Sequence, residues 1–336
     1  MKNPFIKPFS WAIAFSIMLT VSTCFVLLDT FVITRAGTSG SVIFSIPDSS
    51  SETTASSSET SSASESSASV SESSSASSSS TSVPSSMPTV ITANSYSDAN
   101  IQITIDTIRV YSTQVYIADI QVSSFAYLRT AFAKNTYGRN YTEKTSSMAT
   151  NHGALLAING DYYGFRSTGF VVRNGVLYRS TVNQENSGQA LVLDGSGDMH
   201  VVSEANTSTT ALTQLQAWQV WSFGPQLMGN GNIMVDANTE ISSASSASNP
   251  RTALGQISPL HYVFITSDGR TTESAGLSLL ELAEQFDARG CQLAYNLDGG
   301  GSATMWFNGK IVNKPVNSGS TISERAVSDC VYIGYQ

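Results

Sequence analysis

The sequence predicts an α+β domain with a mixed β-sheet, many hairpins and few helices, preceded by one transmembrane helix and a disordered serine-rich segment. Three observations lead to this prediction. An apolar run lies near the N-terminus, a stretch of almost only Ser, Thr, Ala, Glu and Pro follows, and alternating apolar segments separated by turn residues fill the remainder. Alternation with period two is typical of strands, and hairpins with few helices are typical of α+β domains.

The N-terminal apolar run predicts a membrane anchor. Lys2 and Lys7 precede it and Asp29 ends it. About 20 apolar residues cross a bilayer as a helix, and no small-x-small cleavage site follows the run, which favours an uncleaved anchor over a signal peptide. Lysines before the run hold the N-terminus inside. We therefore expect residues 1–8 in the cytoplasm, residues 9–28 as a single pass through the cell membrane, and the C-terminal domain outside the cell.

Composition divides the rest of the chain. We expect a juxtamembrane segment over residues 29–47, a disordered Ser-rich linker over 48–94 and one globular domain over 95–336. The stretch from Asp48 to Pro88 has no aromatic residue, so it cannot bury enough apolar surface to offset the entropy of ordering it. Removing the anchor and linker leaves about 240 residues, enough for one sizeable core.

Charge and cysteine content exclude two classes of function. The formal net charge is −8 and no cluster of Lys and Arg occurs, whereas nucleic-acid-binding proteins carry a basic face. We therefore expect no nucleic-acid partner. Cys291 and Cys330 lie in or beside apolar segments without the spacing of a zinc site. Their surroundings favour two buried thiols over a disulfide.

Strands are expected where apolar residues alternate or form short continuous runs. The first strands are expected over residues 101–105, 108–110 and 115–122, and one or two helices over 123–151. The continuous run from Ala154 to Ile158 predicts a central strand buried on both faces.

Hairpins and one helix follow. Hairpins are expected over 169–178, turning at Asn174-Gly175, over 190–202, turning near Asp194-Gly195, and over 304–312, turning at Asn308-Gly309; further strands are expected over 262–266, 292–297 and 330–333. Asn-Gly pairs suit the type I′ turn of a tight hairpin. Ser278 and Glu281 form a capping box, which predicts a helix that continues to Gly290.

Polar residues follow directly on apolar strands in four loops, where a rigid scaffold presents chemistry. The loop Asn159-Gly160-Asp161-Tyr162-Tyr163 offers a carboxylate, an amide and rings on which a sugar could stack; a plain Asn-Gly turn explains it equally well. The loop 249–253 contains Arg251, whose planar fork matches phosphate or carboxylate, although a solvated surface arginine is the simpler explanation.

The other two loops contain Asp268 and Asp298. Asp268 follows the strand over 262–266 and is followed by Gly269, a pair that is also common turn chemistry. Asp298 precedes Gly299, Gly300, Gly301 and Ser302. Three glycines cost backbone entropy, so we expect a reason for them: converging backbone N–H groups that form an anion-binding nest. A flexible hairpin is the alternative.

These loops together resemble a known family. Residues 158–163, 249–254, 267–270 and 296–303, in this order, are similar to the phosphodiester glycosidase family, the N-acetylglucosamine-1-phosphodiester α-N-acetylglucosaminidase-like domain that also occurs in exopolysaccharide-associated proteins. The resemblance covers about residues 100–336. The family tends to have a late Arg-Pro pair; Arg325 matches its arginine, and Ala326 stands where the proline would be.

The resemblance implies hydrolysis of a sugar that is linked through its anomeric carbon to a phosphodiester, within a cell-envelope or exopolysaccharide glycan. The candidate catalytic residues are Asp161, Asp268 and Asp298. The candidate substrate-binding residues are Asn159, Arg251, Gly299, Gly300, Gly301, Ser302 and Arg325. The second pKa of a phosphate monoester is about 6, so this leaving group needs little protonation, and one carboxylate could suffice. Which aspartate acts is open at this point.

Other interpretations are also open at this stage. Oxygen ligands from the three aspartates suit Ca²⁺, but no EF-hand spacing occurs, so neither a metal nor a cofactor is assigned. The same loops would also fit a non-catalytic glycan-binding module on a membrane stalk. A phosphoesterase that cleaves the P–O bond is a further alternative. In each case the partners are a sugar-phosphate glycan and, through the N-terminal helix, a membrane.

Overall fold

The structure is a computed structural model that describes residues 10–46, 88–183, 188–239, 248–317, 319 and 321–335. The predicted cytoplasmic N-terminus (1–8) and residues 48–87 of the predicted linker lie outside the described residues. The described end of that linker already contains β3 (Val90–Ile91), which pairs with β4 (Ser95–Ser97) of the domain.

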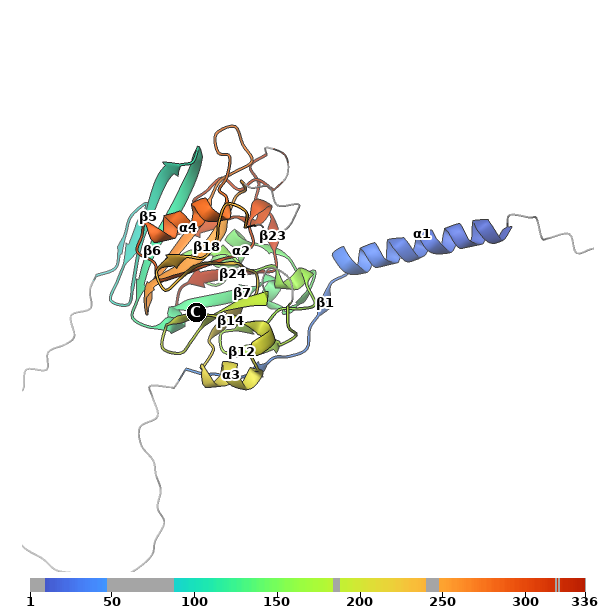
Figure 1. The fold of residues 1–336 in the computed structure, drawn as a ribbon, viewed down its shortest axis with the longest axis horizontal. Coiled ribbons are helices and arrows are strands. Elements are labelled where there is room, and N and C mark those ends of the chain that lie inside the picture. Colours follow the sequence, from blue (N-terminus) through green and yellow to red (C-terminus); the bar gives the residue numbers. More distant parts are fainter. Residues whose placement is uncertain are drawn as a thin grey trace, which may run out of the picture.

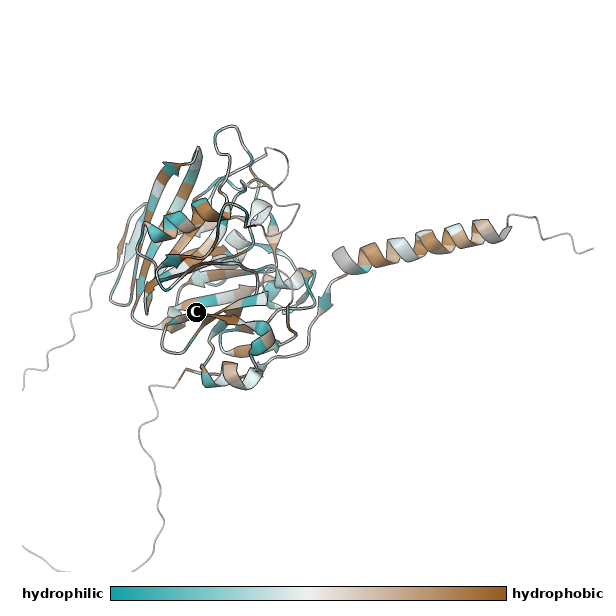
Figure 2. Cartoon of the chain, in the orientation of Figure 1, coloured by the Kyte–Doolittle hydropathy of each residue, from teal (hydrophilic) through white to brown (hydrophobic). Residues whose placement is uncertain are grey.

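The N-terminal helix α1 (Ser10–Phe31) stands apart from the domain (Figure 1). Its window from Ala12 to Asp29 is long and apolar enough to cross a membrane, and none of that window is buried against the rest of the chain. The apolar character of the helix contrasts with the domain, whose strands show hydrophobic and hydrophilic residues in succession (Figure 2). The predicted apolar helix is confirmed, whereas its passage through a membrane stays a prediction.

The domain contains three main sheets and two short strand pairs. The nine-stranded sheet has the spatial order β17 (Asn232–Ile233), β16 (Gln226–Gly229), β20 (Leu293–Asn296), β18 (Thr252–Ser258), β19 (His261–Ser267), β6 (Thr113–Val122), β5 (Ile101–Val110), β4 and β3. The five-stranded sheet has the order β22 (Lys310–Ile311), β21 (Met305–Phe307), β10 (Leu156–Asn159), β24 (Asp329–Ile333) and β7 (Leu128–Phe132). The six-stranded sheet has the order β14 (Met199–Ser203), β13 (Gln189–Leu193), β15 (Gln219–Trp221), β11 (Val171–Arg173), β12 (Val176–Arg179) and β2 (Ser41–Val42). The two pairs are β1 (Arg35–Ala36) with β8 (Gly138–Arg139), and β23 (Ala326–Val327) with β9 (Glu143–Lys144).

The predicted α+β class with few helices is confirmed. The predicted mixed sheet is corrected, because every pairing between these strands of the described chain is antiparallel. Alternation along a strand shows which face is buried but not the direction of its neighbour, so the sequence could not distinguish the two arrangements.

Three short helices cover the outer faces of the sheets. They are α2 (Thr145–Asn151), α3 (Thr209–Gln214) and α4 (Leu279–Asp287). The predicted capping box of α4 is present, since the Ser278 hydroxyl accepts from the Glu281 N–H and the Glu281 carboxylate from the Ser278 N–H. The predicted helix within 123–151 is confirmed as α2, which follows the short strands β7, β8 and β9.

One central core joins all three main sheets. Ile103 of β5, Ile158 of β10 and Leu191 of β13 belong to the same buried cluster. On the outer faces, Phe286 of α4 packs against the nine-stranded sheet, Met148 of α2 against the five-stranded sheet, and Leu212 of α3 against the six-stranded sheet. The strand ends that enclose the site are therefore fixed by one continuous apolar interior.

The predicted buried strand and hairpins are confirmed. All four residues of β10 are buried, and the strand lies between β21 and β24. The turn residues Asn174 and Gly175 have φ values of 51° and 76°, and Asn308 and Gly309 have 43° and 86°, as a type I′ turn requires. Cys291 and Cys330 are buried free thiols, as the sequence favours.

The predicted juxtamembrane segment is part of the domain. Its strand β1 pairs with β8 and its strand β2 with β12. The N–H groups of Ile43 and Phe44 both donate to the carbonyl of Gly175, and the Phe44 ring packs edge-on against Trp218 with centroids 6.4 Å apart. Period-two alternation does not occur over so short a segment, so the sequence did not predict this docking.

Candidate active site

Loops from two sheets meet at Asn159, the last residue of β10. The buried Asn159 amide donates to the carbonyl of Asp298 at 2.6 Å, and its oxygen accepts from the Thr252 hydroxyl at 2.8 Å and the Thr304 N–H at 3.2 Å. One side chain thus joins the five-stranded sheet to the loop after β20 and to the start of β18. Asn159, predicted to bind substrate, is occupied by these contacts and holds the loops together.

The glycine run permits close approach of its neighbours. A Cβ atom at Gly299 would lie 2.7 Å from the Pro250 carbonyl oxygen, one at Gly300 2.8 Å from Arg270 Nη2, and one at Gly301 2.6 Å from Arg325 Cζ. Gly300 also has a φ of 59°, which favours glycine. Each glycine therefore makes room for a different neighbouring group.

Four backbone N–H groups in and beside the glycine run bond within the chain. The N–H groups of Gly300, Ser302 and Ala303 donate to the carbonyls of Pro250, Gly299 and Gly300. The Gly299 N–H donates to the Asp298 carboxylate. These four N–H groups therefore have partners within the chain, one of them the Asp298 carboxylate, and binding of a substrate anion by the run stays a prediction.

Asp298 lines a cavity of about 190 Å³, and Ser302 and Arg325 line it as well. The Ser302 hydroxyl donates to the Asp298 carboxylate. Burial raises the pKa of Asp298, whereas the bond from Ser302 and the charges of Arg325 and Arg166 act to lower it, and the net direction is upward. The result is a carboxylate held among donors and cations, with a higher pKa than an ordinary aspartate.

Arg325 lies at the cavity wall beside the glycine run, as the sequence predicts. Its Nε donates to the Asn317 amide oxygen at 2.9 Å, which orients the guanidinium. Ala326, at the position of the missing proline, begins β23 and also lines the cavity.

Aromatic rings form another wall of the same cavity. Tyr162 and Phe165 line it and stack at 4.8 Å with an interplanar angle of 25°. Arg166 lies over the Tyr162 ring at 5.5 Å and over the Phe223 ring at 4.9 Å. The sequence reasoning missed Phe165 and Arg166. Both follow β10 in the same loop as Asp161, so the rule that sites gather at strand ends could have found them.

Asp161 is in a different position from Asp298. Its side chain is fully buried, forms an ion pair with Arg173 at 2.9 Å, and accepts from the Ser222 N–H at 2.9 Å. Arg173 also pairs with Asp329 at 2.9 Å. Asp161 is absent from the cavity lining, so the structure gives this predicted catalytic residue a structural position instead, because its oxygens face a buried arginine.

Asp268 contacts residues that position the loop at the cavity. Its buried carboxylate accepts from the Lys314 N–H at 2.7 Å and from the Tyr116 hydroxyl at 3.1 Å, and burial raises its pKa. The neighbouring Asn313 donates to the Ala303 carbonyl at 3.0 Å, directly after Ser302. Asp268 does not line the cavity, and its contacts position the loop that does.

Arg251 has a similar supporting position. Its Nε donates to the Leu277 carbonyl at 2.9 Å, and burial lowers its pKa to about 10. The preceding carbonyl, that of Pro250, accepts from the Gly300 N–H at 2.7 Å. Arg251 is absent from the lining of the Asp298 cavity, whereas Arg325 is part of it, and a phosphate contact by Arg251 stays a prediction.

The calcium alternative finds no support in the arrangement of carboxylates. Among the described residues, no group of three or more His, Cys, Asp and Glu side chains could hold a metal ion. Asp161, Asp268 and Asp298 have separate sets of partners, as given above.

A known family matches the part of the chain that contains this site. The model of the phosphodiester glycosidase family matches residues 152–334, more than half of the chain. The chain belongs to the phosphodiester glycosidase family. The match includes all four predicted loops and Arg325, so the predicted resemblance is confirmed.

Individual relatives agree with the family. The chain is 31% identical over 204 residues to the SPbeta prophage-derived uncharacterized protein YomE of Bacillus subtilis, covering 59% of this chain and 31% of that protein. It is also 31% identical over 179 residues to the N-acetylglucosamine-1-phosphodiester alpha-N-acetylglucosaminidase of Mus musculus, covering 48% of this chain and 34% of that protein. The chain therefore spans about a third of the length of these curated relatives.

A solved structure shares the fold. The zebrafish N-acetylglucosamine-1-phosphodiester alpha-N-acetylglucosaminidase catalytic domain, described as auto-inhibited by its pro-peptide, aligns with a TM-score of 0.54 at 21% identity over 70% of this chain and 83% of that chain. At this identity the likeness is one of fold.

Proposed function

We propose that this member of the phosphodiester glycosidase family hydrolyses a sugar-1-phosphodiester at the bond between the anomeric carbon and the phosphate oxygen. The observation that carries the proposal is that Asp298, alone among the three candidate aspartates, lines the cavity, together with Arg325 and the Tyr162 ring. The names of the mammalian relatives support N-acetylglucosamine as the sugar.

The cavity residues suit each part of this reaction. The ionised Asp298 takes a proton from water as the water oxygen attacks the anomeric carbon, or it attacks that carbon itself and water then hydrolyses the glycosyl ester that forms. The C–O bond breaks with its electron pair on the phosphate, and the products are a free sugar and a phosphate monoester. Arg325 stabilises the charge that develops on the leaving phosphate. Glycosidases normally pair two carboxylates, but a phosphate leaves near neutral pH with little protonation, so one carboxylate suffices here.

The size of the cavity favours a single sugar ring. Its volume of about 190 Å³ corresponds to roughly six water molecules at about 30 Å³ each. The stacked Tyr162 and Phe165 rings offer an apolar face of the kind on which a sugar packs. We therefore propose that the enzyme removes a terminal sugar.

The N-terminal helix supports a location at a membrane. We propose that α1 anchors the chain as a single pass with the domain outside the cell, where a cell-envelope or exopolysaccharide glycan with glycosyl-phosphate linkages is the substrate. The apolar window of α1 and the lysines before it are the support for this setting. The anchor and the glycan are then the two partners of the chain.

Release of free sugar from a synthetic N-acetylglucosamine-1-phosphodiester tests the function. We expect the wild-type chain to release sugar and Asp298→Asn to lose about 10²–10⁴-fold in kcat, the usual contribution of a positioned acid or base. Arg109→Gln is the control, because Arg109 bonds the Glu273 carbonyl at 2.8 Å on a strand outside the site. Full activity in Asp298→Asn would refute the assignment.

Two alternatives to this function, a phosphoesterase and a glycan-binding module, can be tested with the same compound. In ¹⁸O-water our proposal places the label in the sugar, whereas a phosphoesterase that cleaves the P–O bond places it in the phosphate. Binding of the same compound without any turnover would instead indicate a glycan-binding module.

A further inference from the structure

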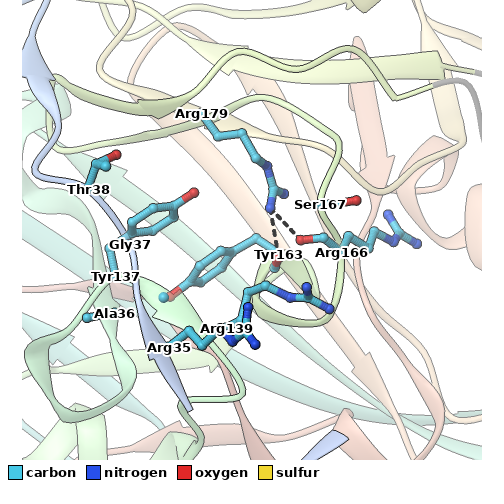
Figure 3. Close-up of a pocket in the computed structure, with 11 residues that line it drawn as sticks. Arg35, Ala36, Gly37, Thr38, Tyr137, Arg139, Tyr163, Arg166, Ser167 and Arg179 are labelled. Atoms are coloured by element: carbon cyan, nitrogen blue, oxygen red, sulfur yellow. Dashed lines mark hydrogen bonds between the residues drawn. The ribbon is translucent and has the colours of Figure 1, made fainter. Parts of the chain in front are cut away.

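A second cavity, separate from the one at Asp298, lies where the juxtamembrane strand β1 meets the domain. Its volume is about 280 Å³, and four arginines line it: Arg35, Arg139, Arg166 and Arg179. Arg179 enters from one side and Arg35 and Arg139 from the opposite side (Figure 3). No Asp or Glu is among the described residues that line this cavity, although the chain as a whole has a net charge of −8.

The positive charge of this arginine cavity is only partly neutralised by the protein. Arg35 pairs with Asp29. Within the described chain, no carboxylate lies within ion-pair distance of Arg139 or Arg179. The Nε of Arg139 is buried and has no hydrogen-bond acceptor. A buried donor without an acceptor costs free energy, so the Arg139 guanidinium has hydrogen-bonding capacity that the described protein does not use.

The walls of the arginine cavity are fixed in place. Arg179 donates through Nε to the Gly169 carbonyl at 2.7 Å and through Nη1 to the carbonyls of Tyr163 at 3.1 Å and Arg166 at 2.7 Å, as the dashed lines to Tyr163 and Arg166 in Figure 3 show. The Tyr137 and Tyr163 rings stack at 5.4 Å with an angle of 14°. The guanidinium of Arg179 is therefore held by backbone carbonyls, and the carboxylates that act on its charge, Asp161 and Glu204, are not in ion-pair contact with it.

We propose that the arginine cavity binds a phosphate ester. Guanidinium groups match phosphate oxygens in paired hydrogen bonds. The volume corresponds to roughly nine water molecules at about 30 Å³ each, which accommodates a phosphate together with part of the group that it esterifies. Arg35 and Arg139 both lie outside residues 152–334, the region that the family model matches.

The phosphate could come from two sources. One loop, residues 160–166, contributes Tyr162 to the Asp298 cavity and Tyr163 to the arginine cavity, so a second phosphodiester of a polymeric substrate could lie there; this use rests on the proposed function. The other source is a lipid headgroup. Arg35 follows the end of α1 by four residues, which span at most about 14 Å when extended.

Calorimetric titration of the full chain in non-ionic detergent with inorganic phosphate tests the site. We expect two phosphates to bind per wild-type chain, one lost in Arg139→Gln and the other in Arg325→Gln. Loss of one charge-assisted contact should weaken the affected site by about tenfold or more. Arg109→Gln should retain both phosphates, and Arg139→Lys should retain part of the binding. Unchanged binding in Arg139→Gln, with an unaltered circular dichroism spectrum, would overturn the proposal whether or not the chain hydrolyses sugar phosphates.

Two further arms identify the source. Headgroup binding predicts that the Arg139-dependent phosphate is displaced in nanodiscs of phosphatidylglycerol but not in nanodiscs of phosphatidylcholine. Substrate binding predicts that a two-phosphate oligomer has a KM about tenfold below that of the one-phosphate compound, and that Arg139→Gln removes this difference. If neither arm depends on Arg139, a phosphate ester is not the ligand.

Discussion

At the scale of single residues, two opposing effects act on the pKa of Asp298. Burial raises this pKa, and the charges of Arg325 and Arg166 lower it. Only the ionised carboxylate can accept a proton from water or attack carbon. Activity should therefore fall as the pH decreases through this raised pKa, so the acid limb of kcat/KM should lie above the 3.8 of an ordinary aspartate. Arg325→Gln removes a lowering influence and should move the limb to higher pH. Profiles of kcat/KM against pH for wild type, Arg325→Gln and Arg109→Gln measure this, and a limb that stays in place or moves down would contradict it.

The buried Arg173 presents a second residue-scale case, because it faces both Asp161 and Asp329. Two carboxylates against one guanidinium leave one excess negative charge in the interior. Burial raises the pKa of Asp329 to about 7, Arg173 opposes this, and Asp161 adds to it. One proton makes the group neutral.

This group should make stability depend on pH. The folded pKa of Asp329 lies above its unfolded value of 3.8. Protonated Asp329 therefore adds to the free energy of unfolding in acid. This stabilisation is lost as the pH rises from about 4 to about 7, and it amounts to a few kcal/mol at most. We expect Tm to fall from pH 5 to pH 8 in the wild type and to fall less in Asp329→Asn. Asp106→Asn, on an exposed strand, is the control. A steeper fall in Asp329→Asn than in wild type would refute the argument.

At the scale of elements, the glycine run depends on the absence of side chains. A Cβ at Gly301 would lie 2.6 Å from Arg325 Cζ, so Gly301→Ala must displace that guanidinium. A misplacement of about 1 Å can cost about 10²-fold in rate, whereas Tm should change little because Arg325 lies at the cavity wall. Gly334→Ala is the matched control, since its Cβ would meet atoms no closer than 3.3 Å. Steady-state kinetics and thermal melts of both variants separate activity from stability, and normal kinetics in Gly301→Ala would contradict the proposed role.

Local patterns explain which elements the sequence could predict. The hairpin at Asn174-Gly175, the buried strand β10 and the cap at Ser278 each depend on neighbours within a few residues, and each was predicted. The assignment of strands to three antiparallel sheets depends on pairing between distant segments, which a period of two does not contain.

The absence of long-range pairing from local sequence patterns also explains why some predicted site residues line the cavity and others do not. Asp161 and Asp298 both follow buried strands, and both were predicted as catalytic candidates, with the glycine run favouring the Asp298 loop. Their difference comes from Arg173, which lies on another strand and forms an ion pair with Asp161 but not with Asp298. Local sequence contains no sign of that pairing. By contrast, Ser302 and Arg325 were predicted at the cavity, and the structure places both in its lining.

At the scale of the whole molecule, the serine-rich segment is attached to the domain at both ends. Before it, the N–H of Phe44 bonds to the Gly175 carbonyl, and after it β3 pairs with β4. The distance from α1 to the domain is therefore set by the few residues before β1 and not by the length of the serine-rich segment. The sequence suggested a stalk, because it shows the order of segments but not their pairing.

A protease site inserted within residues 51–84 tests this architecture. After cleavage we expect the fragment containing α1 to co-purify with the domain, because β1 and β2 remain paired with β8 and β12. Gly40→Val in the same chain should release the domain, since a Cβ at Gly40 already lies 2.8 Å from the Leu177 carbonyl oxygen. Release of the domain without Gly40→Val would show that the pairing is too weak to hold it.

The docking of the juxtamembrane strands has a consequence for how the domain would be retained in the proposed membrane-anchored arrangement. Extracellular proteases cut exposed, small polar stretches most readily, and in many tethered proteins a single cut sheds the ectodomain. In the proposed arrangement, a cut between Ile46 and Pro88 would leave the domain bound to the fragment that contains α1, because β1 and β2 remain paired with β8 and β12. The serine-rich stretch could then be trimmed, lengthened or modified without release of the domain.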